Sequence, residues 1–249
     1  EKNELQKFIP NIRGEYTLFS PSTGIFDTYK FMQVLETIAK NNEVLISYNS
    51  EVTGIEKVNG NYKIIVKEQD NNTFEFLSEI VINCAGLYSE RIAQIVDIDT
   101  KSAGYKIHYG KGEYFSLPGK YKNLFNSLIY PVIPLNSKSL GIHTVLDLQG
   151  MIKLCPNIFY VKEIDYSVNE LHRKEFYNAV KKYFPFIEED ELSPDMAGIR
   201  PKIQGPGDNF KDFVINEEKD KGLPGFINLI GIDSPGLTSY LAIAKYVSN

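Results

Sequence analysis

The chain has 249 residues, a formal net charge of −5 at pH 7, and an ordinary globular composition with many Tyr and Phe and no Trp. A chain of this length can bury a sizeable core and can hold one large domain or two smaller ones. No basic stripe offsets the acidic balance, which argues against nucleic acid as a partner. No segment approaches the ~20 apolar residues of a membrane span, so we expect no transmembrane segment.

Two cysteines, Cys84 and Cys155, lie far apart in apolar surroundings. They are too few for a disulfide scaffold, and no group of residues has metal-ligand spacing, so we expect no metal and a reducing, cytoplasmic compartment. No signal peptide is visible, and the chain begins at Glu1 rather than Met, which leaves open whether a segment precedes it.

The N-terminal third predicts one helix followed by small antiparallel strands. After an amphipathic piece at 3–8, a loop rich in turn residues leads to Asp27 or Thr28, either of which can cap a helix. The i, i+3, i+4, i+7 spacing predicts that this helix buries one face, made of Phe31, Val34, Leu35 and Ile38. A short strand is expected at 43–48. Asn59-Gly60 then separates strands at 52–58 and 62–67, the strongest short-range hairpin signal, and 73–77 completes a meander.

Residues 80–86 form a continuous apolar run that ends in small residues, which is typical of a strand covered on both faces. Small residues at the carboxyl end of a buried strand let a ligand lie against the backbone, although simple helix–strand packing also explains them. Ser89 is expected to cap the helix that follows.

The middle of the chain is typical of β structure, with strands expected at 106–117, 128–132, 140–146 and 151–154 between Pro and Gly turns. Ser167 and Glu170 form a capping box, which predicts a helix from there to Phe184, ended by Pro185.

The last part predicts short strands at 197–201 and 213–216, then a strand from Phe226, the turn Ser234-Pro235-Gly236 and a closing helix. The start of that helix suits an anion, but an isolated Ser-Pro-Gly is more often an ordinary strand-to-helix turn. The layout predicts an α/β (α+β) fold in which α/β material at both ends encloses an antiparallel β insert.

Eight short motifs occur along nearly the whole chain: PSTGIFD (21–27), INCAGLYS (82–89), GEYF (112–115), IYPV (129–132), LGIH (140–143), PN (156–157), AGIRP (197–201) and DSPGLT (233–238). In type and order they resemble the FAD-dependent D-amino-acid-oxidase superfamily, and most of all its L-2-hydroxyglutarate dehydrogenase/oxidase branch. The resemblance implies a FAD/NAD(P)-binding, glutathione-reductase-like domain, here partial, at 1–100 and 186–249. It implies an antiparallel β substrate domain at 101–185.

The family's G-x-G-x-x-G turn, which anchors the FAD diphosphate, is absent from the sequence, and Gly205-Pro206-Gly207 is followed by charged residues rather than a suitable helix. The chain thus resembles the C-terminal two-thirds of a family member, as a fragment, one product of a split gene, or a remnant. The resemblance implies FAD as cofactor, held weakly or not at all by this chain alone, and a complementary N-terminal Rossmann polypeptide as a partner. An uncovered apolar sheet edge also predicts homo-oligomers.

The resemblance implies that the start of the closing helix faces the electron-rich edge of the flavin ring. The residues that would contact FAD are Val52, Cys84, Ala85, Gly86, Ile199, Arg200, Asp233, Ser234, Pro235, Gly236, Leu237 and Thr238.

The implied reaction is oxidation of a small 2-hydroxy acid such as L-2-hydroxyglutarate, with hydride transfer to flavin. His143 is the candidate base, because an imidazole suits removal of the hydroxyl proton; the alternative is a structural histidine on a strand. His108 and His172 match no motif and are expected to be surface or packing residues.

The carboxylate of such a substrate needs a cation, and Arg200 is the first choice, with a structural ion pair as the alternative. Lys111 stands where close relatives have Arg, and Cys155 stands where relatives tend to have Gly. Tyr130 and Thr23 are further candidates for substrate contact, with packing as the alternative for Tyr130.

Two other functions stay open. One is a glycerol-3-phosphate dehydrogenase-like flavoenzyme, whose relatives share the Ser-Pro-Ser-Thr-Gly loop style. The other is a non-catalytic remnant that binds no FAD alone.

Overall fold

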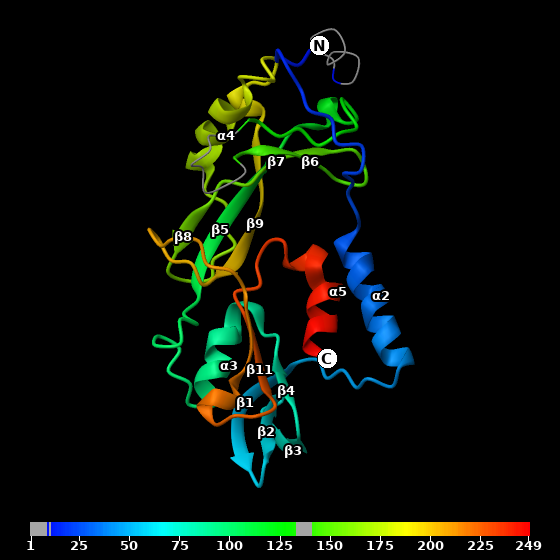
Figure 1. Cartoon of the computed structure of the whole chain (residues 1–249). Helices are drawn as coiled ribbons and strands as arrows, with labels where there is room; N and C mark the ends of the chain where they lie inside the picture. The colour runs from blue at the N-terminus through cyan, green and yellow to red at the C-terminus, as the bar shows by residue number, and fades with distance from the viewer. Residues whose placement is uncertain (1–8, 10, 133–140) are drawn as a thin grey trace. The chain divides into compact units, whose positions relative to one another are not determined.

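The computed structural model describes residues 9, 11–132 and 141–249, which form two compact units (Figure 1). Unit 1 comprises 1–44, 111–159 and 165–198, and unit 2 comprises 45–110, 160–164 and 199–249. The expected amphipathic piece at 3–8 and Leu140 of the LGIH motif lie outside the described residues.

Unit 2 contains the predicted meander. Strands β1 (Ser50–Val58), β2 (Asn61–Glu68) and β3 (Thr73–Ser78) form an antiparallel sheet in the order β1-β2-β3. Asn59 and Gly60 have φ of +50° and +85°, and they join the register partners Val58 and Asn61, which confirms the two-residue hairpin. The short strand expected at 43–48 does not form, and residues 44–47 have no regular secondary structure.

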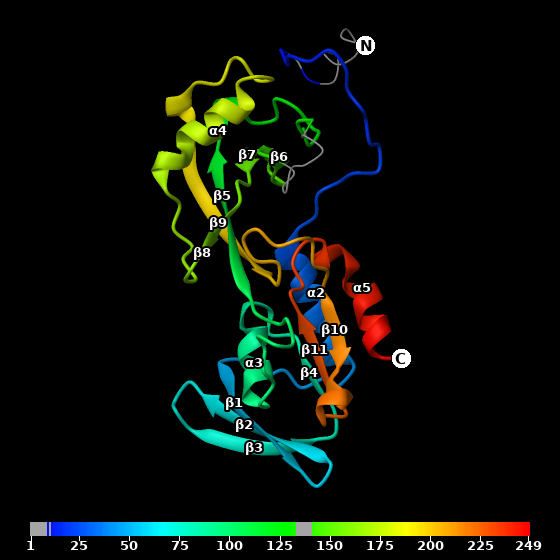
Figure 2. The same ribbon diagram turned by 60° about the vertical axis from the view of Figure 1, so that its left-hand side comes forward.

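A second sheet of unit 2 has the order β10-β11-β4, from β10 (Val214–Glu217), β11 (Phe226–Ile230) and β4 (Val81–Asn83). β4 runs parallel to β11, and β10 runs antiparallel to it. Helix α3 (Ser89–Ile95) packs on β4, β11 and β1, so that it lies between this sheet and the meander (Figure 2). The core between them includes Ile55, Tyr62, Ala93, Phe226 and Ile230.

The prediction that residues 80–86 form a strand covered on both faces is wrong. β4 has only three residues, and Ile80 and Ile82 remain 58% and 48% exposed. In the described part of the chain β4 pairs with β11 alone, so its other edge has no neighbour. Ser89 begins α3 but does not cap it, and its buried Oγ has no hydrogen-bond partner in the structure.

The antiparallel insert is a five-stranded sheet in the order β6-β7-β5-β8, with β9 also paired to β5. Its strands are β5 (His108–Ser116), β6 (His143–Leu146), β7 (Ile152–Cys155), β8 (Phe159–Val161) and β9 (Ser193–Lys202). Helix α4 (Arg173–Val180) packs on β5 in unit 1, where the Phe176 and Phe115 ring centroids are 4.7 Å apart. The strand expected at 128–132 is not formed.

The helix expected from Ser167 to Phe184 is shorter and starts differently. The Asn169 side chain, rather than Ser167, accepts a hydrogen bond from the Leu171 N–H at 3.0 Å and opens the 3₁₀ turn η3 (Glu170–His172), which continues into α4. The other 3₁₀ turns are η1 (Gly86–Tyr88), η2 (Gly119–Tyr121), η4 (Glu189–Glu191) and η5 (Glu218–Lys221).

The first and last described helices are α2 (Thr28–Asn41) and α5 (Gly236–Val247). Asp27 caps α2 as predicted, accepting from the Lys30 N–H at 3.0 Å. The expectation that α2 buries one face is wrong, since none of its residues is buried and Val34 and Ile38 are exposed. Among the helices of the described ranges, none combines the length and apolarity needed to cross a bilayer. The mixed α/β prediction is confirmed.

Candidate functional site

His143 is the first residue of β6 and lies directly opposite Cys155 on β7; both side chains are buried. Its Nδ1 is 2.9 Å from the Gly141 carbonyl oxygen. Because a carbonyl oxygen only accepts, Nδ1 carries the proton, and in the neutral ring the lone pair is on Nε2. His143 can therefore accept a proton at Nε2.

The segment that carries Tyr130 is fastened to β6 by Thr144. The Thr144 N–H donates to the Ile129 carbonyl at 3.0 Å, and the Ile129 N–H donates to Thr144 Oγ1 at 2.8 Å. The Tyr130 ring stacks on the His143 ring, with centroids 4.4 Å apart and planes at 22°. Burial, with a smaller effect of Cys155, raises the pKa of Tyr130, so its phenol is protonated at neutral pH.

Lys111 lies buried on β5 within a cluster of charged groups. Its Nζ is 2.9 Å from Asp165 Oδ2 and 3.8 Å from Glu113 Oε1. The Lys111 ammonium, together with Ser167, holds the pKa of Asp165 well below its usual range. Carboxylates of the chain itself thus balance the charge of Lys111, and a substrate carboxylate there would compete with Asp165. The substrate role of Lys111 stays a prediction.

Glu113 is the buried centre of this cluster. It accepts a hydrogen bond from the Asn169 N–H at 3.2 Å, and its Oε2 is 2.5 Å from His172 Nδ1. His172 therefore helps to satisfy a buried carboxylate, which agrees with a packing role. His108 packs edge-on against Tyr160, with ring centroids 6.3 Å apart. Thr23 lies in an exposed loop and donates to Ser20 Oγ at 2.9 Å.

In unit 2, a cavity of about 320 Å³ brings together three predicted flavin contacts, Val52 from β1 and Cys84 and Ala85 after β4. Most of the other lining side chains are apolar, and they include Ile80 and Ile82 at the edge of β4 that has no neighbour among the described residues. Gly86 follows with a φ of +56°, and a Cβ there would meet nothing within 4 Å, so its backbone lies open to a ligand.

Three buried polar residues fix the backbone at this strand end. Asn83 Nδ2 donates to Asn228 Oδ1 at 2.7 Å, and Asn83 Oδ1 accepts from the Ala85 N–H at 3.2 Å. Asn228 Nδ2 in turn donates to Glu218 Oε1 at 2.8 Å. This network was not predicted from the sequence. The signal for it was an Asn in each of two otherwise apolar strands, Asn83 in β4 and Asn228 in β11.

The closing turn is exposed at Ser234, Pro235, Leu237 and Thr238. Helix α5 has no side-chain cap at its N-terminus, and a Cβ on Gly236 would lie 2.5 Å from Ile232 Cγ2, so the turn requires glycine. Asp233 pairs with Lys202 at 2.9 Å, which balances its charge next to this helix end. The start of α5 is therefore open to a polar ligand.

Ile199 and Arg200 are half-buried on β9. Across the ranges that the structure describes, the Arg200 guanidinium makes neither an ion pair nor a hydrogen bond, whereas Lys202, two residues along the same strand, is paired with Asp233. The expected alternative of a structural ion pair for Arg200 thus has no partner among those residues. Arg200 is a cation available to an anion.

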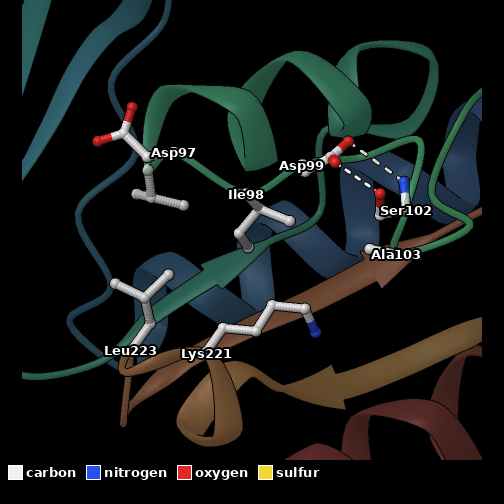
Figure 3. Close-up of a pocket in the computed structure, with 8 residues that line it drawn as sticks. Asp97, Ile98, Asp99, Ser102, Ala103, Lys221 and Leu223 are labelled. Atoms are coloured by element: carbon white, nitrogen blue, oxygen red, sulfur yellow. Dashed lines mark hydrogen bonds between the residues drawn. The ribbon is translucent and has the colours of Figure 1, made fainter.

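A further cavity of about 370 Å³ in unit 2 contains none of the residues singled out from the sequence (Figure 3). The side chains of Asp99 and Lys221, which line it, are already paired within the chain. Asp99 accepts hydrogen bonds from the Ser102 N–H and Oγ, and Lys221 Nζ is 2.5 Å from Glu218 Oε2. This cavity is not part of the candidate site.

The family model described as FAD dependent oxidoreductase matches residues 1–249. The L-2-hydroxyglutarate dehydrogenase of Arabidopsis thaliana mitochondria is 32% identical over 283 residues, which cover 99% of this chain and 58% of the relative. A glycerol 3-phosphate dehydrogenase from Caloramator mitchellensis is 28% identical and is matched over 95% of this chain and 45% of its own length.

Among solved structures, the FAD-bound L-alpha-glycerophosphate oxidase from Mycoplasma pneumoniae has a TM-score of 0.74 at 22% identity. The match covers 99% of this chain and 62% of the oxidase, and it confirms the expected fold. This chain therefore spans roughly half to two-thirds of the length of these relatives.

Proposed function

Because the chain belongs to the FAD dependent oxidoreductase family, we propose that it forms part of a flavoenzyme that oxidises a small 2-hydroxy acid of the L-2-hydroxyglutarate type. The substrate class is supported by the Arabidopsis relative. The observation that carries the chemistry is His143, a buried imidazole whose Nδ1–H is fixed by the Gly141 carbonyl, so that Nε2 is its proton acceptor. In the proposed reaction Nε2 takes the hydroxyl proton as the C–O bond becomes a carbonyl.

The residues of unit 2 fit the proposed cofactor in part. The strand end at Cys84 and Ala85, with the open backbone of Gly86 beside it, suits a ring that lies against the backbone, and the open start of α5 at 234–238 suits a carbonyl edge that gains negative charge. Bound FAD would accept the hydride from the α-carbon of the substrate. No G-x-G-x-x-G turn is present to hold the diphosphate.

We assign the substrate carboxylate to Arg200, whose charge has no partner among the described residues. A planar guanidinium can hold a carboxylate through two parallel hydrogen bonds. Tyr130, Thr23 and Lys111 are secondary candidates for contact with the substrate. The assignment of residues 1–100 and 186–249 to FAD binding, and of 101–185 to the substrate, belongs to this same proposal.

We propose that FAD binding needs a glycine-rich βαβ segment that lies outside these 249 residues, on the same polypeptide or on a separate one. The support is β4, whose second edge has no neighbour in the described part of the chain and whose Ile80 and Ile82 are exposed. A parallel strand added there would pair the backbone and cover both side chains. Self-association through the same edge is the competing outcome.

The second candidate function is oxidation of glycerol 3-phosphate, which the Caloramator relative favours. The two substrates differ in the anion that Arg200 would meet, a carboxylate in one case and a phosphate in the other. A non-catalytic chain that binds no flavin is the third outcome.

The test uses protein produced from its own gene with the sequence that flanks these codons. FAD content is measured first, followed by anaerobic loss of flavin absorbance with L-2-hydroxyglutarate, its D-isomer and glycerol 3-phosphate. We expect reduction by L-2-hydroxyglutarate and a loss of about 10²- to 10⁴-fold in His143→Asn. The matched control is His108→Asn, which removes another imidazole without touching the proposed site. Reduction by glycerol 3-phosphate alone, or an unimpaired His143→Asn, would overturn the proposal.

A further inference from the structure

His143 and Cys155 are register partners across the β6–β7 ladder, so their side chains project from the same face of the sheet. Cys155 Sγ lies 3.9 Å from His143 Nε2, and both side chains are buried. This contact involves the ring nitrogen that the proposed reaction uses, while the other ring nitrogen is held by the Gly141 carbonyl.

The proton positions follow from the partners. The Gly141 oxygen cannot donate, so Nδ1 holds a proton and the neutral ring has its lone pair on Nε2. The group facing that lone pair is a thiol, which is a weak donor. We propose that Cys155 is a positioning residue whose S–H donates to His143 Nε2, holding the imidazole in the Nδ1–H tautomer and occupying its proton-accepting atom until substrate displaces it.

Two phenols also interact with this pair. Tyr130 stacks on the His143 ring, and burial and Cys155 raise the pKa values of both Tyr130 and Tyr183. Tyr183 donates to the Ile142 carbonyl at 3.2 Å, in the residue before His143. Both phenols are therefore neutral at physiological pH and add no charge to the imidazole.

A thiol that donates to Nε2 stabilises the neutral imidazole, so its removal favours the imidazolium. We expect Cys155→Ala to raise the pKa of His143, because the neutral imidazole loses one weak hydrogen bond. Cys155→Ser keeps a donor at the same position and should stay close to wild type. Cys84→Ala removes the other free cysteine, which is exposed and belongs to unit 2, and should leave the tautomer and the pKa of His143 unchanged.

The decisive measurements need no flavin. Long-range ¹H–¹⁵N NMR reports the tautomer of each of the three histidines, with His143 assigned by its loss in His143→Asn. Infrared spectroscopy of Cys84→Ala then observes the S–H stretch of Cys155 alone, since the chain has two cysteines. We expect an Nδ1–H tautomer for His143, and an S–H band that moves to higher frequency in Cys84→Ala/His143→Asn.

An Nε2–H tautomer in the wild type, or an S–H band indifferent to His143, would overturn the inference even if Cys155→Ala fails to fold. Naming His143 as the base rests on the proposed function, whereas the thiol–imidazole contact does not. A protein with the predicted spectra that no substrate reduces would refute the proposed function alone. A reducible enzyme with the Nε2–H tautomer would refute the role of Cys155 and the assignment of Nε2 as the proton acceptor, but not the proposed substrate class.

Discussion

Glu218→Gln should destabilise the protein by about 2 kcal/mol, although it removes only one charge and no volume. Glu218 is fully buried at the start of η5, where it receives hydrogen bonds from Asn228 Nδ2 at 2.8 Å and Lys221 Nζ at 2.5 Å. A hydrogen bond to a charged group contributes about 1.5–3 kcal/mol. A neutral amide can still accept from Asn228, so the loss is mainly the charge-assisted bond to Lys221.

The matched control is Asp220→Asn, which removes a charge from the same 3₁₀ turn at an exposed site and should cost less than about 0.5 kcal/mol. Urea unfolding followed by circular dichroism measures both variants, and 2 kcal/mol corresponds to a midpoint shift of roughly 1 M. Hydrogen exchange at the β11 amides, next to Asn228, locates the change. Equal stability of the two variants would refute the reasoning.

The stability difference between wild type and Glu218→Gln should also depend on pH. Despite its burial, the hydrogen bonds from Lys221, Asn228 and Tyr105 hold the pKa of Glu218 below its ordinary value of 4.5. A carboxyl with a depressed pKa in the folded state contributes stability above that ordinary value and loses it as the pH falls. The difference between wild type and Glu218→Gln should therefore shrink below about pH 4.5. A difference that grows in acid would contradict this assignment.

Two further substitutions test the packing around the candidate site. Gly231→Ala should destabilise the protein more than Gly207→Ala. Both glycines have positive φ (+71° and +83°), so either alanine incurs about 1–2 kcal/mol of strain, but only at Gly231 would the new Cβ lie 2.8 Å from Ile203 Cγ2. Similar unfolding midpoints for the two variants would count against this prediction. Thr144→Val keeps the shape of the side chain but leaves the Ile129 N–H without its side-chain acceptor, so we expect the free energy of unfolding to fall by about 1–3 kcal/mol. Tyr130 should also become more mobile in NMR relaxation, and Thr53→Val, at an exposed strand position, is the control.

The local features of this fold were predictable from the sequence. Asn59-Gly60 specifies its hairpin through two residues that tolerate positive φ, and Asp27 marks the start of α2 through a bond to the third residue along. The closing strand, turn and helix follow from an apolar run that ends at Ser234-Pro235-Gly236.

Features that depend on distant partners were not predictable. The apolar run at 80–86 resembles a covered strand, but exposure of Ile80 and Ile82 depends on which element lies beside β4. His172 and Glu113 are 59 residues apart, and no local pattern joins a histidine in a 3₁₀ turn to a carboxylate on β5. At the start of α4, Ser167 and Asn169 are both good caps, and the choice of Asn169 depends on how Glu113 holds its N–H.

The pairing of β4 with β11 has a consequence for synthesis on the ribosome. Asn83 and Asn228, which bridge the two strands, are separated by 145 residues. At a translation rate of about 5–20 residues per second, the earlier strand waits roughly 7–29 s before its only described neighbour has been made. During that interval the nascent polypeptide exposes Ile80 and Ile82 without a neighbouring strand to pair with. The segment is then a natural client of chaperones that bind extended apolar segments.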